Sequence, residues 1–221
     1  MIDFIAAARD HQIKPGEFGP WTIKRINHKH KVTKRLLGVD RHTLLYKITP
    51  ATMHIPPGEI VMDDSRLELA RHMPLWLAAR GRVILTGLGM GCCLRGLLAN
   101  PAVDHVTVIE IDRQIMKWIG PEFEGNLRCD LILADALTWP IPAGARWSIA
   151  WHDIHDDGYQ LQQLHAQLFL KFFKHADQQG AWSFPRPMKR VIAERSFPLV
   201  GGQTRRIRSA ATRMPMEGDD R

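Results

Sequence analysis

Three acidic side chains follow apolar runs of the kind that form buried strands. Glu110 ends the run VTVIE, Asp135 follows the run LILA, and Asp153 comes two residues after the run WSIAW. A carboxylate at the end of a buried strand loses solvation unless a hydrogen-bond donor approaches it. We therefore expect these three residues to bind hydroxyl or amino groups of a ligand.

The loop after the third run, HDIHDDGY, carries five ionisable side chains within six positions. Histidine and aspartate together can bind a metal ion, but these ligands would all come from one tight loop without a distant partner. We expect no metal site. Asp156 and Asp157 have an alternative role as the cap and first turn of a following helix. Asp153, at the strand end itself, fits that role less well.

A glycine-rich turn, TGLGMGC, joins a predicted strand to a predicted helix and contains Gly87, Gly89 and Gly91. Such a turn brings a helix N-terminus and bare backbone close to a ligand. The phosphate-binding P-loop needs a Lys and a hydroxyl residue that are missing here, and the dinucleotide fingerprint needs a glycine where Cys92 stands. A tight turn without any ligand stays open as the alternative.

The carboxylates suit a nucleoside. Glu110 lies about 20 residues beyond the turn, where a carboxylate can accept hydrogen bonds from both hydroxyls of a ribose. Asp135, at the end of the next strand, would accept a hydrogen bond from an adenine amino group. We predict that the cofactor-binding residues are Gly87, Gly89, Gly91, Glu110 and Asp135.

Strand and helix patterns alternate along the later part of the chain. The predicted strands cover 83–86, 105–110, 131–134, 147–151 and 180–184. The predicted helices cover 92–99 and 113–119, followed by an amphipathic helix with apolar residues at Leu161, Leu164, Leu168, Phe172 and Phe173. This alternation predicts an α/β fold with a Rossmann-like, doubly wound, mostly parallel sheet. A hairpin over 196–210 would complete the sheet.

The chain up to residue 62 has a different texture. Short alternating runs at 21–26, 42–49 and 58–62 are separated by Pro and Gly turns, which predicts a small antiparallel sheet. We expect a β-rich N-terminal subdomain over 1–62 and the Rossmann-like domain over 63–221.

A helix over 65–80 is predicted to join the two regions. Ser65 and Glu68 form a capping-box pattern, in which each side chain bonds to the other residue's backbone. Pro74 should kink or split this helix, and Gly81 should end it.

The composition is that of a globular protein, with 221 residues and 45% hydrophobic content. No apolar stretch approaches the roughly 20 residues that a membrane span needs, and we recognise no secretion signal. The three cysteines, two of them adjacent, match neither a disulfide framework nor metal-ligand spacing. We expect a cytoplasmic protein that does not bind a membrane.

The formal net charge of +7 comes largely from a basic stretch at 24–42 and a cluster at 205–208. Basic surfaces bind nucleic acids, but single-strand binding also uses aromatic residues between the basic ones, and none are interleaved here. A solvated basic surface is therefore the preferred interpretation, and a nucleic-acid partner is the less favoured one.

Four segments, in order along the chain, carry a resemblance to a known family. They are ELARHMPL at 68–75, the glycine turn at 83–91, VIEID at 108–112 and DIHD at 153–156. Together they resemble the class I S-adenosylmethionine (SAM)-dependent methyltransferase superfamily, and within it the polyamine aminopropyltransferase (spermidine synthase) branch. The match covers somewhat under half of the chain. It implies SAM as the cofactor and, from the D-x-x-D loop of that branch, Asp153 and Asp156 as catalytic residues.

Five positions depart from the family patterns. Met90 stands where the branch has an Asp for the aminopropyl amine, and Arg66 and Leu67 stand where it has residues that hold the diamine. Asp157 replaces a usual Pro, and Thr86 stands where methyltransferases often have an acidic residue. A diamine is a dication, so Met, Arg and Leu in place of carboxylates and aromatic faces remove its attraction.

We therefore expect a SAM-dependent transferase, and specifically a methyltransferase acting on a small-molecule acceptor. Asp153 would orient or deprotonate the acceptor, and His152, His155 and Tyr159 would line its pocket. The alternatives are an aminopropyltransferase and a non-catalytic SAM-fold module that binds a partner through its basic N-terminal surface. The resemblance also implies a homodimer.

Overall fold

The computed structural model describes residues 2–28, 40–47, 59–154 and 161–182. His155, Asp156 and Tyr159 lie outside these residues, as do the predicted hairpin over 196–210 and the basic cluster at 205–208.

Five strands form one parallel sheet, in the order β7-β6-β5-β8-β9. Their bounds are β5 (Gly81–Thr86), β6 (Val103–Glu110), β7 (Cys129–Leu133), β8 (Trp147–His152) and β9 (Ala176–Ala181). Every neighbouring pair is parallel, which confirms the predicted Rossmann-like sheet. The last strand begins earlier than predicted because its sequence, ADQQGA, has no apolar run to mark it.

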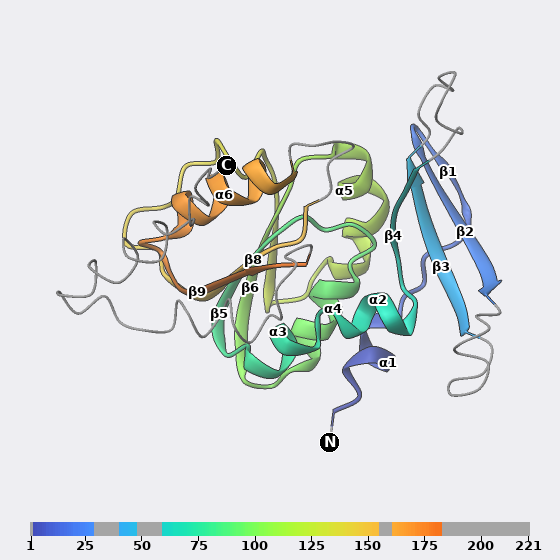
Figure 1. Ribbon diagram of the computed structural model, residues 1–221, viewed down its shortest axis with the longest axis horizontal. Helices are drawn as coiled ribbons and strands as arrows, with labels where there is room; N and C mark the ends of the chain where they lie inside the picture. The colour runs from blue at the N-terminus through green and yellow to red at the C-terminus, as the bar shows by residue number, and fades with distance from the viewer. Residues whose placement is uncertain (1, 29–39, 48–58, 155–160, 183–221) are drawn as a thin grey trace, which may run out of the picture.

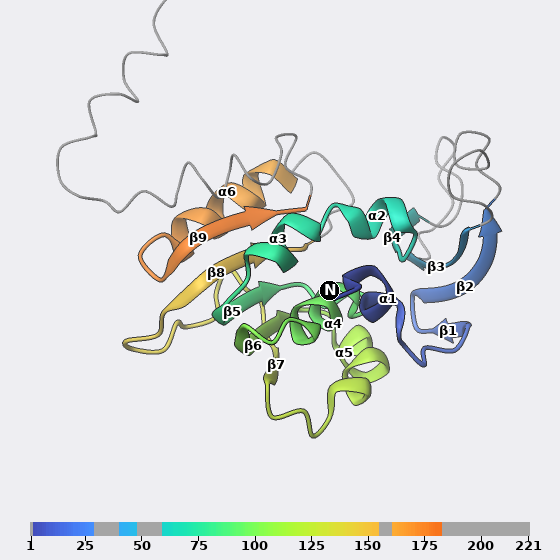
Figure 2. The ribbon, with the colours of Figure 1, turned by 90° about the horizontal axis from the view of Figure 1, so that it is seen from below.

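Helices cover both faces of this sheet (Figures 1 and 2). Alternate residues of β5 show the division: Val83 and Leu85 face a core built with α3 (Met73–Ala78), α4 (Cys92–Ala99) and α5 (Arg113–Ile119), whereas Ile84 faces the core beside α6 (Leu161–Phe172). Buried runs with side chains on both faces are expected for strands of a doubly wound sheet. Phe173, predicted on the apolar face of α6, is exposed, and Phe169 is buried in its place.

The predicted helix over 65–80 is split, as Pro74 indicated, into α2 (Arg66–Ala70) and α3. The hydroxyl of Ser65 accepts a hydrogen bond of 3.2 Å from the amide of Glu68, so Ser65 is the cap. The reciprocal bond of a capping box is not formed. The Asp63 carboxylate accepts from the Ser65 amide at 2.8 Å instead, which leaves Glu68 to pair with Arg71.

The N-terminal sheet is antiparallel, in the order β1-β2-β3-β4, as the sequence predicted. Its strands are β1 (Gly16–Phe18), β2 (Trp21–His28), β3 (Asp40–Lys47) and β4 (Glu59–Asp63). Figures 1 and 2 show this sheet beside the α/β layers, with β4 adjoining α2. The division into subdomains at residue 62 stays a prediction.

A helix that the sequence analysis did not predict, α1 (Phe4–Arg9), precedes the N-terminal sheet. Its Phe4 ring stacks on Trp76 of α3 with centroids 6.0 Å apart, so the helix packs on the α/β core. After it, His11 and Asp64 form a buried pair at 2.9 Å that ties this segment to the end of β4. Burial alone would raise the pKa of Asp64, but the hydrogen bonds from His11 and the Thr43 amide lower it overall. No helix in the described part of the chain is long and apolar enough to cross a membrane.

Candidate functional site

A cavity of about 350 Å³ lies at the carboxyl ends of the parallel strands, and the N-terminal sheet forms its far wall. Strands β6 and β7 lie on one side of β5, and β8 and β9 lie on the other. The crevice at such a reversal of strand order is where open α/β sheets bind ligands, and the volume is in the usual range of about 300–1,000 Å³. Among the predicted site residues, the cavity is lined by Gly87, Gly89, Glu110, Asp135 and Asp153. The N-terminal sheet contributes Trp21, Leu45, Val61 and Met62.

Glu110 is buried, with 6% of its surface exposed, and both carboxylate oxygens are held by backbone amides. Oε2 accepts from Leu88 and Oε1 from Asp112, each at 2.7 Å. Burial raises the pKa of this carboxyl, although the backbone hydrogen bonds oppose the rise. The Gly89 amide is a further donor to this carboxylate. Three of its roughly four lone-pair sites are then used by the protein, and the remaining capacity faces a ligand in the cavity. Glu110 therefore both holds the glycine turn and presents acceptors to the cavity.

Asp135 follows β7 and caps its own turn. Its Oδ1 accepts from the Leu137 amide at 2.8 Å, and its backbone carbonyl accepts from Trp139 at 2.7 Å. Ala134, Ala136 and Leu137 line the cavity beside it. The Asp135 charge also interacts with Lys171. No hydrogen bond to its other carboxylate oxygen is found among the described residues, so that oxygen suits a donor on a bound ligand.

Each glycine of the turn has a positive φ: +93° at Gly87, +52° at Gly89 and +74° at Gly91. Side chains there would also collide, at Gly87 with the Asp153 carbonyl oxygen and at Gly89 with the Met62 sulfur. Gly91 does not line the cavity: it caps α4, and the Phe123 ring lies over it. The glycines are therefore needed for the turn itself and for close packing, and only the first two border the cavity.

Asp153 is the least compensated carboxylate of the site. Its amide donates to the Thr86 carbonyl at 2.8 Å, which fixes the backbone, and 13% of its side chain is exposed. Burial raises the pKa of Asp153 to about 7, and no charge or hydrogen bond from the described residues opposes this rise. Strongly perturbed carboxyls in cavities are typical of functional sites.

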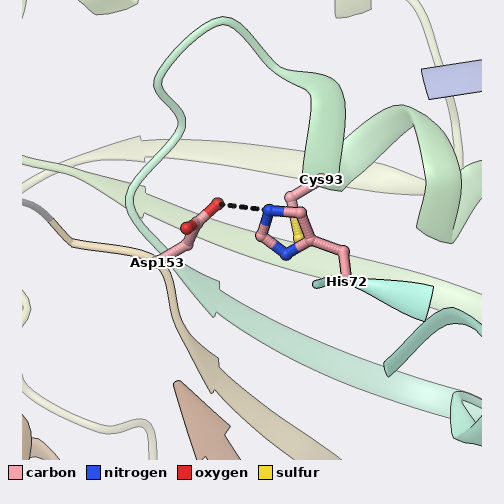
Figure 3. A group of neighbouring side chains, drawn as sticks. All are labelled: His72, Cys93 and Asp153. Atoms are coloured by element: carbon pink, nitrogen blue, oxygen red, sulfur yellow. Dashed lines mark ion pairs between the residues drawn. The ribbon is translucent and has the colours of Figure 1, made fainter. Parts of the chain in front are cut away.

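Two residues that the sequence analysis did not select lie beside Asp153 (Figure 3). His72, between α2 and α3, brings Nε2 to 4.0 Å from the carboxylate, and Cys93 is in the first turn of α4. Burial lowers the pKa of His72 to about 4 and raises that of Cys93 well above its ordinary value. His72 belonged to the segment ELARHMPL that carried the family resemblance, but the sequence analysis gave it no role. Cys93 carried no signal in the sequence.

One residue predicted to line the acceptor pocket, His152, does not reach the cavity. His152 is fully buried on the opposite face, between the Thr86 hydroxyl at 3.1 Å and Gln179 at 3.3 Å, so its expected place in the acceptor pocket is wrong. The reason is strand alternation: consecutive side chains point to opposite faces, so His152 and Asp153 diverge.

The positions that depart from the aminopropyltransferase pattern also lie elsewhere. Met90 is fully buried in the core, and the Met62 sulfur covers its amide at 3.0 Å. Arg66 and Leu67 are exposed on α2. None of these three side chains faces the cavity, so they do not tune its ligand directly.

No protein-family model matches the sequence, and no curated protein matches it either. Solved structures match about half of the chain. The 23S rRNA methyltransferase ErmE is 21% identical with a TM-score of 0.41, over 52% of this chain and 44% of its own. A dimethyladenosine transferase from Plasmodium falciparum is 19% identical with a TM-score of 0.38, over 50% and 37%.

Human methyltransferase-like protein 13 in complex with SAH is 18% identical with a TM-score of 0.37, over 50% of this chain and 56% of its own. The chain covers less than two thirds of each of these structures. Likeness at this level assigns no family.

Proposed function

We propose that this protein is a SAM-dependent methyltransferase. The observation that carries the proposal is the buried Glu110 carboxylate, held by two amides at the wall of a cavity that Gly87 and Gly89 border. A carboxylate fixed in this way is preorganised to accept both hydroxyls of a ribose. Because the protein already fixes the Glu110 side chain, no further conformational entropy is lost there when the ligand binds.

The remaining lining suits the rest of a nucleoside. Asp135 would accept the adenine amino group, and Ile111 and Leu137 offer apolar surface for the base. The hydroxyl of Thr86 is hydrogen-bonded to His152 and does not line the cavity. The methionine part of SAM would therefore be bound by backbone groups of the glycine turn.

SAM supplies a methyl group on a sulfonium centre, and its transfer by in-line attack needs alignment more than strong acid–base help. Asp153 lies at the cavity wall with a pKa near neutrality, where a general base is most effective. We assign it to orient the nucleophile of the acceptor and to accept its proton. Asp156 stays a predicted catalytic residue.

We propose a small-molecule acceptor rather than a nucleic acid. The described cavity lining has five carboxylates and neither Lys nor Arg; the carboxylates are Glu68, Glu110, Asp112, Asp135 and Asp153. This arrangement repels phosphate groups, whereas nucleic-acid binding depends on neutralising them. We also propose a cytoplasmic location, from the composition, and a homodimer, from the family resemblance.

Titration calorimetry with SAM, its demethylated product SAH, decarboxylated SAM and NAD tests the cofactor. We expect SAM and SAH to bind at least as tightly as decarboxylated SAM, and NAD not to bind. Clear preference for decarboxylated SAM would restore the aminopropyltransferase alternative, and NAD binding without SAM binding would overturn the proposal. Methyl transfer is then sought with radiolabelled SAM and a panel of small acceptors; a nucleic acid as the sole methylated substrate would contradict the proposed acceptor class.

A further inference from the structure

His72, Cys93 and Asp153 form a compact group from three separate segments of the chain (Figure 3). One potential ligand atom from each residue lies within 4.8 Å of the others. His72 and Cys93 are 2% and 1% exposed, whereas Asp153 opens onto the cavity. The His72 ring contacts the rings of Trp76 and Trp151, and Cys93 belongs to the buried core, so the surrounding packing holds both side chains in place.

Polar atoms of this group lack hydrogen-bond partners within the described part of the chain. Nδ1 of His72 is buried without a hydrogen-bond partner, and Nε2 lies 4.0 Å from Asp153, too far for a hydrogen bond. The Asp153 carboxylate is mostly buried beside this ring, with 13% of its side chain exposed. Buried polar groups are nearly always paired, so unpaired groups gathered at one point call for an explanation.

The three side chains share one chemical capacity: each is a metal ligand. Neutral imidazole, thiolate and carboxylate are the ligands that bind Zn²⁺, whereas Mg²⁺ and Ca²⁺ are bound by oxygen atoms alone. A divalent ion with one thiolate and one carboxylate would leave the buried group neutral overall.

We propose that His72, Cys93 and Asp153 bind a divalent cation of the zinc type. Bonds of about 2.0–2.3 Å to tetrahedral zinc place ligand atoms roughly 3.3–3.7 Å apart, so the side chains would draw together by about an ångström. The Cys93 thiol loses its proton to solvent when the sulfur–metal bond forms. Binding therefore releases a proton and strengthens as the pH rises.

The location indicates an open rather than a closed site. His72 and Asp153 both line the cavity, so a fourth coordination position on that side would be available to water or to an acceptor atom. Three protein ligands and one open position are typical of catalytic zinc sites. If the proposed methyltransferase function holds, the cation would orient the acceptor, and Asp153 would act as the base only in the metal-free protein. The metal proposal itself does not rest on that function.

The test uses the full chain, freed of metal with a chelator and titrated with Co²⁺ and then Zn²⁺ in the absence of SAM. We expect one Co²⁺ per chain, with the intense near-ultraviolet absorption of a cobalt–thiolate bond, and displacement of Co²⁺ by Zn²⁺. Cys93→Ser should abolish this absorption and weaken Zn²⁺ binding by at least about 100-fold, because even outer partners of metal ligands are worth about 10–100-fold.

Cys92→Ser is the matched control, because Cys92 is the adjacent buried cysteine and lies outside the group. It should keep both the absorption and the Zn²⁺ affinity of the unmodified protein. Should Cys93→Ser fail to fold, His72→Gln with Cys93 intact should still lower the Zn²⁺ affinity. The proposal is overturned if the unmodified protein binds no stoichiometric Co²⁺, or if Cys93→Ser retains the thiolate absorption. Titration of the metal-free protein with SAM measures cofactor binding without the metal, so the proposed function can fail or hold independently of the metal site.

Discussion

The indole nitrogen of Trp21 donates a 3.0 Å hydrogen bond to Asp112, which is 91 positions further along the chain. The other oxygen of Asp112 caps α5 by accepting from the amides of Gln114 and Ile115. The amide of Asp112 in turn donates to Glu110. The N-terminal sheet is thus joined, through one helix cap, to the carboxylate that we assign to the ribose.

Trp21→Phe should loosen this connection without removing the aromatic packing. We expect a loss of about 1 kcal/mol in the free energy of unfolding, the usual net worth of one hydrogen bond. SAM affinity should fall several-fold, because the cap that positions Glu110 is less restrained. Denaturant unfolding and calorimetry measure the two effects. Trp118→Phe is the control, because Trp118 lies on α5 beside Phe18 of β1 and its replacement keeps the Trp21–Asp112 hydrogen bond. Equal losses of SAM affinity in both variants would contradict the connection.

Glu110→Gln should cost both stability and cofactor affinity. One carboxylate oxygen becomes an amide NH₂ that faces a backbone N–H, which leaves a buried donor unpaired at about 1–3 kcal/mol. SAM affinity should fall by one to several orders of magnitude, since about 1.4 kcal/mol corresponds to tenfold.

Asp135→Asn is the comparison, because its Oδ1 can still accept from Leu137. It should lower SAM affinity about tenfold and leave stability within about 0.5 kcal/mol, as for surface-like changes. SAM affinity unchanged in Glu110→Gln, while the protein stays folded, would remove the assignment of the ribose site.

Alanine at Gly87 and Gly89 of the turn, compared with alanine at Gly125 outside the turn, should separate backbone strain from steric collision. Gly125 has a φ of +78° and open space around its Cα, so Gly125→Ala measures strain alone, about 1–2 kcal/mol. Gly89→Ala meets only the movable Met62 sulfur and should cost slightly more. Gly87→Ala meets the backbone of Asp153 and should be the most destabilising of the three in thermal unfolding. Any other order would contradict the packing of the turn on Asp153.

The free energy of unfolding of the metal-free protein should depend on pH through the ionisation of Asp153. The pKa of Asp153 is about 7 in the folded protein and 3.8 as its ordinary value. Between these two pH values the folded protein keeps a proton on Asp153 that the unfolded chain has released. Stability from this group is therefore lost as the pH rises from about 4 to 7. Asp153→Asn cannot ionise, so it should be more stable than the unmodified protein at pH 8, by at most roughly 4 kcal/mol, and equal to it near pH 4.

His72 titrates in the opposite sense between about 4 and 6.5, but it is present in both proteins and largely cancels in the difference. The same variant should keep its SAM affinity and lose about 10²–10⁴-fold in methyl transfer if the carboxylate acts as a base. Denaturant unfolding at pH 4, 6 and 8 checks the first expectation. A variant less stable at pH 8 than the unmodified protein would show that Asp153 is a structural residue.

Much of the local structure was predictable because it depends on near neighbours in the chain. Asp112 caps α5 through amides two and three residues away, and Pro74 splits its helix because it removes a backbone donor in place. The parallel sheet follows from repeated strand–helix alternation, which shows in the apolar runs themselves. Strand β9 was displaced in the prediction because its buried positions include Gln179 and Gly180, which carry no apolar signal.

The sequence by itself therefore determined the strand-turn-helix order, the caps and the carboxylates at the strand ends. Only the tertiary structure decided which of these side chains meet. Glu110 binds the turn 22 residues before it, His72 and Cys93 reach Asp153 from distant segments, and His152 turns away from the cavity. The physical reason is that spacing specifies a side chain's direction only within its own element. The packing of whole elements on a shared core then sets which directions converge.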